Sequence, residues 1–453
     1  MTRTSPTHRG AIGAHASPTH RRTFRTSAFP THRRALGAAC LAAALAVLAA
    51  SPAPADTPSA HRDRGSLVLV GGGLKDDNAQ VYGEIVRRAG GPGRARIGIL
   101  TAASIPAAQD PDADDPERCS NSECNGAYYA DLFRRYGADD AEWIPVDLDH
   151  LANADSDEVV ARINSMSGFF FGGGDQYRYV TSLLHGERHT DSKVLAAIRA
   201  KLAAGAVVAG SSAGAQIASG PDMLTGGDSY PALRDGSRPG YFEDPSVLGY
   251  LPGGGFGFLR SGLLDTHTGT NGREGRSLRL AADTGHHTVY ALDENTALIV
   301  DAPGSRREHL TVLGTQGVGL LRLSGAHAGV GPAGWHLHGA RYDYLTTGDT
   351  YTPRTGEVTT PGKEPLAPSP TVPVPANTDV FYSPHNSRGT PYSLRGTARA
   401  LAASTQRTAT ATTYESGPRF TVTLSEPRRF RALSADGTTA ETLLGLRLDI
   451  DAG

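Results

Sequence analysis

Gly210-Ser211-Ser212-Ala213-Gly214 joins an apolar run, Ala206-Val207-Val208-Ala209, to a stretch that favours a helix, Ala215-Gln216-Ile217-Ala218. A G-x-S-x-G sequence between a strand and a helix is typical of a nucleophile elbow, a sharp turn that exposes the serine hydroxyl. The glycines permit the strained backbone, and the start of the following helix favours negative charge that develops near Ser212. We therefore predict that Ser212 is a nucleophile. A glycine- and serine-rich loop without chemistry is the alternative.

Apolar runs and helix-compatible stretches alternate around this elbow. The predicted strands cover residues 66–70, 96–100, 142–146, 168–171 and 206–209, and the predicted helices cover 79–89, 128–136, 159–166 and 192–204. This alternation predicts an α/β fold with a doubly wound, mostly parallel sheet. Ligands of such sheets bind beyond the carboxyl ends of the strands, where glycine-rich turns follow Phe171 and Ala209.

The first 55 residues differ in composition from the rest of the chain. They hold seven Arg and no acidic residue, and Arg33-Arg34 precede an apolar stretch at 35–50 and an A-x-A cleavage site, Ala53-Pro54-Ala55. This order is typical of a signal peptide, and the arginine pair also fits a twin-arginine signal. A membrane anchor is the alternative, but the stretch is short for a bilayer span. We expect a secreted, extracellular protein without stable membrane association after processing.

The charge and cysteine content narrow the partners and cofactors. The formal net charge of −2 includes the basic first 55 residues, so the remainder is acidic and a poor partner for nucleic acid. Cys119 and Cys124 lie beyond the signal region and could close a small disulfide loop. Two cysteines without a histidine at ligand spacing predict no zinc site, and we expect no metal and no cofactor.

The sequence changes character again beyond about residue 325. Six prolines between 361 and 375 predict an extended linker. Residues 420–424 and 430–433 have the alternating polarity of exposed antiparallel strands. We expect these regions: a signal peptide and basic N-region at 1–55, the main domain at 66–325, an extension and Pro-rich linker at 326–378, and a small β-rich appendage at 379–453.

A nucleophilic serine needs a base, and one histidine stands out among 16. His267 ends the sequence Leu264-Asp265-Thr266-His267 and is followed by Arg273, Arg276 and Arg279. Arginines at this spacing on a helix could bind carboxylates with their guanidinium groups. A solvated helix face is the alternative.

Four motifs occur in a characteristic order. They are Gly172-Gly173-Gly174-Asp175-Gln176, the elbow at 210–215, Asp265-Thr266-His267, and Leu292-Asp293-Glu294-Asn295-Thr296-Ala297-Leu298. Over roughly residues 66–323 the chain resembles the cyanophycinase family of serine exopeptidases, which are related to aspartyl dipeptidases. The resemblance implies a class I glutamine-amidotransferase-like fold. It also implies hydrolysis of cyanophycin, a poly-aspartate with arginine on each β-carboxyl, to β-Asp-Arg dipeptides through an acyl-enzyme, without metal or ATP.

The resemblance also implies roles for individual residues. Ser212 matches the nucleophile and His267 the general base, and the amides of Gly174 and Ala213 match an oxyanion hole. The residues that match the substrate-binding positions are Asp175, Gln176, Asp265, Arg273, Arg276 and Arg279.

The third member of the triad is harder to place. The resemblance implies a glutamate near Tyr230, and the nearest carboxylate there is Asp228. We predict Asp228 as the acid, and the alternatives are Asp235, Glu243 and Asp244. Glu294 is assigned to a turn at a strand end, without a catalytic role.

Two other functions stay open. One is an aspartyl or isoaspartyl dipeptidase of narrower specificity. The other is a non-catalytic binder of acidic or arginyl polymers, which is suggested by the absence of a glutamate at the expected position near Tyr230. A homodimer is compatible with either function.

Overall fold

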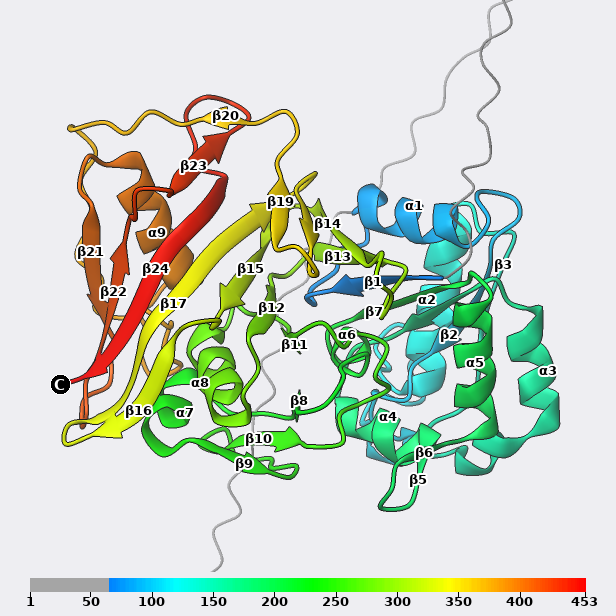
Figure 1. The fold of residues 1–453 in the computed structure, drawn as a ribbon. Helices are drawn as coiled ribbons and strands as arrows, with labels where there is room; N and C mark the ends of the chain where they lie inside the picture. The colour runs from blue at the N-terminus through cyan, green and yellow to red at the C-terminus, as the bar shows by residue number, and fades with distance from the viewer. Residues whose placement is uncertain (1–64) are drawn as a thin grey trace, which may run out of the picture. The chain divides into compact units, whose positions relative to one another are not determined.

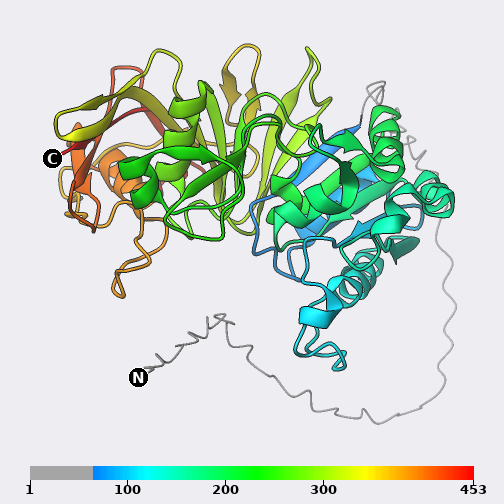
Figure 2. The same cartoon turned by 90° about the horizontal axis from the view of Figure 1, so that it is seen from below.

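The computed structural model describes residues 65–453, which Figures 1 and 2 show in two views. The predicted signal region at 1–55 lies outside the described residues. No helix between residues 65 and 453 combines the length and apolar character needed to cross a membrane.

A nine-stranded mixed sheet carries the elbow. Its parallel part has the order β1 (Ser66–Val70), β7 (Val207–Ser211), β4 (Gly168–Phe171), β2 (Arg96–Leu100) and β3 (Asp140–Trp143). Beyond β1 the sheet continues with antiparallel β13 (Thr296–Asp301), β14 (His309–Gly314), β18 (Thr350–Thr352) and β19 (Glu357–Thr359). The predicted α/β character is confirmed.

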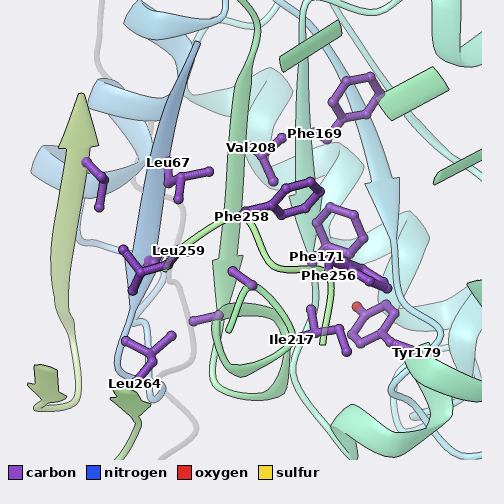
Figure 3. Close-up of a cluster of buried hydrophobic side chains, with 14 of the residues drawn as sticks. Leu67, Phe169, Phe171, Tyr179, Val208, Ile217, Phe256, Phe258, Leu259 and Leu264 are labelled. Atoms are coloured by element: carbon purple, nitrogen blue, oxygen red, sulfur yellow. The ribbon is translucent and has the colours of Figure 1, made fainter. Parts of the chain in front are cut away.

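Helices cover both faces of the parallel strands because successive strand residues point to opposite sides. Phe170 of β4 faces α1 (Ala79–Arg88) and α2 (Ser122–Arg135). Phe169 and Phe171 face a second core that includes residues of α3 (Asp157–Ser165), α4 (Gln176–Leu183) and α5 (Lys193–Ala203). Figure 3 shows this second core, with Val208 of β7 beside the phenylalanines. The strands are thus buried on both sides, which explains their continuous apolar runs.

A second sheet of ten strands lies in the C-terminal half of the chain. Its main path is β11 (Leu263–Asp265), β12 (Thr288–Leu292), β15 (Gly317–Arg322), β17 (Gly334–Thr346), β24 (Thr442–Ala452), β22 (Phe420–Ser425) and β21 (Thr408–Thr412). β16 (His327–Gly331), β23 (Arg431–Ser434) and β20 (Glu364–Pro365) pair at its sides. In Figure 1 the yellow β17 runs beside the red β24.

The predicted limits at residues 325 and 378 do not coincide with an edge of this sheet. β17, from the predicted extension, pairs with β15 of the main domain and with β24 of the predicted appendage. Leu337, Tyr342 and Tyr344 of β17 are buried. The C-terminal region is therefore not a separate appendage, because one sheet and one core continue across both limits.

Shorter elements complete the fold. The helices are α6 (Ala213–Gln216), α7 (Ser229–Asp235), α8 (Glu274–Thr284) and α9 (Ser393–Ala403), and the 3-10 helices are Ala107–Gln109 and Leu151–Asp155. The short strands are β8 (Met223–Leu224), β9 (Ser237–Pro239), β10 (Leu248–Leu251), β5 (Leu184–His185) and β6 (Thr190–Asp191). The predicted disulfide is confirmed, since Cys119 is bonded to Cys124 at the start of α2.

Candidate active site

The elbow has the strained geometry that its sequence predicts. Ser212 lies between β7 and α6 with φ 56° and ψ −119°, a conformation that residues with a side chain seldom adopt. A Cβ atom on Gly210 would lie 2.1 Å from the carbonyl oxygen of Gly214, and one on Gly214 would lie 1.9 Å from that of Phe171. Both glycines are therefore required for α6 to begin so close to the ends of β7 and β4.

A continuous chain of hydrogen bonds runs from Ser212 through His267 to Glu294. Nε2 of His267 lies 2.7 Å from Oγ of Ser212, and Nδ1 lies 2.6 Å from Oε1 of Glu294. If Nδ1 carries the ring proton and donates a hydrogen bond to the carboxylate, Nε2 is unprotonated and can accept the serine proton. This arrangement has the geometry of a Ser-His-carboxylate triad.

The carboxylate on His267 is Glu294 rather than the predicted Asp228. The hydrogen bond from His267 lowers the pKa of Glu294, which favours its ionised form. Asp228 occupies the N-cap position of α7, and its side chain makes no capping hydrogen bond. Within residues 65–453, no hydrogen bond joins Asp228 or any of the predicted alternatives, Asp235, Glu243 and Asp244, to the imidazole.

Sheet geometry explains why Glu294 reaches the imidazole. β11 and β12 are neighbouring parallel strands, with Asp265 opposite Ala291, and their carboxyl ends meet at one edge of the sheet. His267 leaves the first strand and Glu294 leaves the second, so both side chains reach the same place. The motif at 292–298 contains this glutamate, but the sequence predicts only a turn there, because sequence separation does not reveal which strands pair. With Glu294 present, the missing acid no longer supports a non-catalytic binder.

The turn after β1 packs directly against the side chains of His267 and Glu294. A Cβ atom on Gly72, where φ is +98°, would lie 2.2 Å from Cε1 and Nε2 of His267. One on Gly73 would lie 2.9 Å from the carboxyl carbon of Glu294. The backbone N–H of His267 donates to the Gly71 oxygen at 2.6 Å, and that of Asn295 donates to the Gly72 oxygen at 2.8 Å. This turn therefore holds the loops that carry His267 and Glu294.

Two amides that could form an oxyanion hole are available near Ser212. Ala213 is the first residue of α6, and Gly174 has φ +135° in the turn after β4. Within the described part of the chain, neither N–H donates a hydrogen bond. Gly173 lies against Ser212, since a Cβ atom on it would be 3.4 Å from the serine Cβ. A substrate oxygen could reach this place.

Asp175 and Gln176, predicted to bind substrate, make structural contacts. Asp175 caps α4 by accepting from the Tyr177 N–H at 2.8 Å, and its second oxygen accepts from the Tyr241 hydroxyl at 2.7 Å. The Gln176 amide donates to the carbonyl oxygens of Leu224 and Thr225, at 3.1 and 3.2 Å. Both residues join α4 to neighbouring segments, and their polar groups are largely occupied.

Asp265 and Arg276 form a buried ion pair instead of a substrate site. Arg276 donates two hydrogen bonds to the Asp265 carboxylate, at 2.9 and 2.7 Å, and a third to the Gly227 oxygen at 2.7 Å. The side-chain exposed fractions are 7% for the arginine and 0% for the aspartate. The pair therefore fixes α8 to β11, and both charged groups, which were predicted to bind substrate, are used in this contact.

Arg273 and Arg279 have different surroundings. Each step of three residues along a helix turns by about 300° instead of a full circle, so successive arginines point in different directions. Arg279, also predicted to bind substrate, pairs with Asp283 at 2.8 Å and lies over the Trp335 ring. Arg273 is half-buried and donates to the Thr266 oxygen at 3.0 Å. Burial lowers its pKa to about 10, and the charge of Glu294 acts on it in the opposite direction. Arg273 is the arginine of the series that stays beside the triad.

The C-terminal helix α9 and strand β17 contact the loops that carry His267 and Glu294. The sequence did not predict these contacts. Asp293 accepts from the Gly269 N–H at 2.9 Å and from the Tyr344 hydroxyl at 2.7 Å. The Tyr392 N–H, at the start of α9, donates to the Gly269 oxygen at 2.6 Å. Arg395 of α9 pairs with Asp293 at 3.3 Å.

Comparison with known proteins gives a consistent result. Residues 120–306 match Peptidase family S51. A cyanophycinase from Synechococcus elongatus is 26% identical over 309 residues, 67% of this chain and 84% of the relative. The cyanophycinase of a Nostoc species is 27% identical over 306 residues, 65% of this chain and 87% of the relative. The resemblance to the cyanophycinase family is confirmed.

The protein is a serine-type peptidase. The S51 match contains Ser212, His267 and Glu294, whereas the turn after β1 and α9 lie outside it. A crystal structure of a peptidase from an acI-B1 actinobacterium superimposes with a TM-score of 0.41 at 19% identity, over 64% of this chain and 98% of that one. No cluster of three or more metal-ligating side chains occurs between residues 65 and 453 of this peptidase.

Proposed function

We propose that the protein is a secreted serine exopeptidase that hydrolyses cyanophycin to β-Asp-Arg dipeptides. The observation that carries the proposal is the hydrogen-bonded series of Ser212, His267 and Glu294, at 2.7 and 2.6 Å. The substrate class is suggested by relatives that are named cyanophycinases. Secretion rests on the signal-like residues 1–55, and the proposed fold is a doubly wound, glutamine-amidotransferase-like one.

In the proposed reaction, His267 removes the proton of Ser212 as its Oγ forms a bond to the substrate carbonyl carbon. The oxygen of the tetrahedral intermediate accepts hydrogen bonds from the Gly174 and Ala213 amides, each worth about 3 kcal/mol in such sites. His267 then gives its proton to the leaving amine as the C–N bond breaks. Glu294 keeps the imidazole oriented and stabilises its charged form.

The second half of the reaction regenerates the enzyme. Water attacks the acyl ester while His267 accepts its proton, the bond to Oγ breaks, and the proton returns to Ser212. Arg273 is the proposed partner of an aspartyl carboxylate, because guanidinium groups bind carboxylates well and this one is beside Glu294. We propose no metal, no cofactor and no nucleic-acid partner.

The test is incubation of purified protein with cyanophycin, with identification of the products by mass. We expect β-Asp-Arg from the wild type and none from Ser212→Ala. Ser211→Ala is the matched control, because Ser211 is the buried neighbour at the end of β7 and should leave the activity intact. Product formation by Ser212→Ala at the wild-type rate would contradict the proposal. Cleavage of aspartyl dipeptides without cleavage of the polymer would favour the dipeptidase alternative.

A further inference from the structure

A polar pocket of about 380 Å³ lies between α7 and the C-terminal segments 379–385 and 413–417. Its lining includes Asp228 and Tyr230 from the α7 region, and His385, Tyr414 and Glu415 from the C-terminal segments. The triad residues are not part of this lining. The pocket is therefore a second feature of the described chain, separate from the triad.

Asp228 presents an unused carboxylate to this pocket. An aspartate at an N-cap position ordinarily accepts a hydrogen bond from the helix backbone, but the Asp228 side chain makes none. Burial raises its pKa above the usual value, while the charges of Arg276 and Arg273 act in the opposite direction without a hydrogen bond to its carboxylate. The nearby guanidinium of Arg276 is committed to Asp265 and to the Gly227 oxygen. A cationic ligand would thus supply the partner that Asp228 lacks.

The other charged groups leave the pocket with surplus negative charge. Glu415 is close enough to Asp228 to disfavour its ionisation, while the pocket's arginine, Arg234, pairs with Asp235 at 2.6 Å. His385 is the other basic residue in the lining. Tyr414 is 45% exposed and lines the pocket, whereas the Tyr230 ring already has the Arg234 guanidinium over it, 5.6 Å from the ring centroid. Carboxylates beside aromatic faces favour a guanidinium or an ammonium group.

The pocket shares a wall with the catalytic histidine loop. Asn271 lines the pocket, and its backbone N–H donates to the His267 oxygen at 3.0 Å. Ser229, another lining residue, donates its hydroxyl proton to the Gly272 oxygen at 2.6 Å. The wall of the pocket is therefore connected directly to the loop that carries His267.

We propose that this pocket is a subsite for the cationic side chain of the substrate, with Asp228 as the residue that selects it. The proposal rests on the proposed peptidase function of the neighbouring triad. Asp228 lies within the region that matches Peptidase family S51, whereas lining residues 379–417 lie outside it, so the C-terminal region completes the pocket.

The kinetic test compares a β-aspartyl-arginine substrate with its citrulline counterpart, which has a similar shape and no charge. We expect the wild type to favour arginine by about tenfold or more in kcat/KM, and Asp228→Asn to lose this preference. Asp157→Asn is the matched control, because this exposed aspartate also lies at the start of a helix, α3. An unchanged preference in Asp228→Asn would overturn the proposal.

A binding test separates the subsite from the chemistry. In the Ser212→Ala protein, calorimetry should detect arginine amide binding more tightly than citrulline amide, with the difference lost on adding Asp228→Asn. Glu415→Gln gives a second variant, with a smaller expected loss, which decides the outcome if Asp228→Asn does not fold. If no peptide is hydrolysed but this pattern is found, the proposed function fails and the subsite stands. Equal binding of the two amides would overturn the subsite.

Discussion

Nδ1 of His267 lies 2.6 Å from Oε1 of Glu294, and this contact joins the loops that leave two neighbouring parallel strands. The two residues are far apart in the sequence and adjacent at the sheet edge. The backbone of the turn after β1 holds both loops, through hydrogen bonds to Gly71 and Gly72. The orientation of the imidazole is thus fixed by the sheet and by the glutamate together.

Glu294→Gln should lower kcat by about a thousandfold or more, because an amide can hold the wrong imidazole tautomer and cannot stabilise the imidazolium. Asp228→Asn should instead lower kcat/KM by about tenfold, and only for substrates with a cationic side chain. Steady-state hydrolysis of an aspartyl peptide by both purified variants measures the difference. A larger loss of kcat in Asp228→Asn than in Glu294→Gln would mean that Asp228, and not Glu294, is the carboxylate of the triad.

The stability of the protein should depend on the ionisation of Glu294. Its pKa is lowered in the folded state by the hydrogen bond from His267, so the folded state binds the proton less readily than the unfolded state. This contribution is present above the ordinary glutamate pKa of about 4.3 and is lost as the pH falls through the folded value. Thermal unfolding of the wild type and Glu294→Gln between pH 7 and pH 3 measures it. The difference in Tm should shrink on acidification, and a constant difference would contradict the linkage.

Gly72→Ala should abolish most of the activity. Its Cβ would lie 2.2 Å from the His267 ring, and its φ of +98° is unfavourable for alanine, so the imidazole must move from Ser212. We expect kcat to fall at least about a hundredfold, because small misplacements of catalytic groups have effects of this size. Gly83→Ala in α1 is the control, since its Cβ meets nothing within 4 Å and should stabilise the helix by about 0.5–1 kcal/mol. Wild-type kcat in Gly72→Ala would show that the turn does not position His267.

Tyr344→Phe should lower kcat more than it changes KM. The lost hydroxyl donates to Asp293, the residue before the catalytic glutamate, and its loss should cost about 1–3 kcal/mol of unfolding free energy. Tyr342→Phe is the control on the same buried face of β17, because within residues 65–453 its hydroxyl makes no hydrogen bond that positions the site. Kinetics and denaturant unfolding of both variants separate positioning from stability. An equal fall in kcat for the two variants would contradict the role of Tyr344.

The sequence was most informative where local pattern and burial agree. The predicted strands 66–70, 96–100 and 168–171 match β1, β2 and β4, since continuous apolar runs are typical of strands covered on both faces. The elbow and its approach to His267 were anticipated from motif and resemblance. Helix α4 at Gln176–Leu183 was missed because its first residues are polar and resemble a loop.

What the sequence did not reveal are contacts set by strand pairing. Glu294 reaches His267 because β11 and β12 are neighbours, and α9 reaches Gly269 through a fold that brings the end of the chain to the site. The arginine series illustrates the same limit. Its spacing predicts a helix, but only the packing shows that the Arg276 guanidinium is paired with the Asp265 carboxylate.

Mapping the residue labelled by a serine-directed phosphonate tests most directly whether Ser212 is activated by His267. Mass spectrometry of digested protein should find one adduct, on Ser212, with labelling largely lost in His267→Ala. A wild-type protein that hydrolyses aspartyl peptides without an adduct on Ser212, or equally fast labelling in His267→Ala, would contradict the proposed catalytic triad.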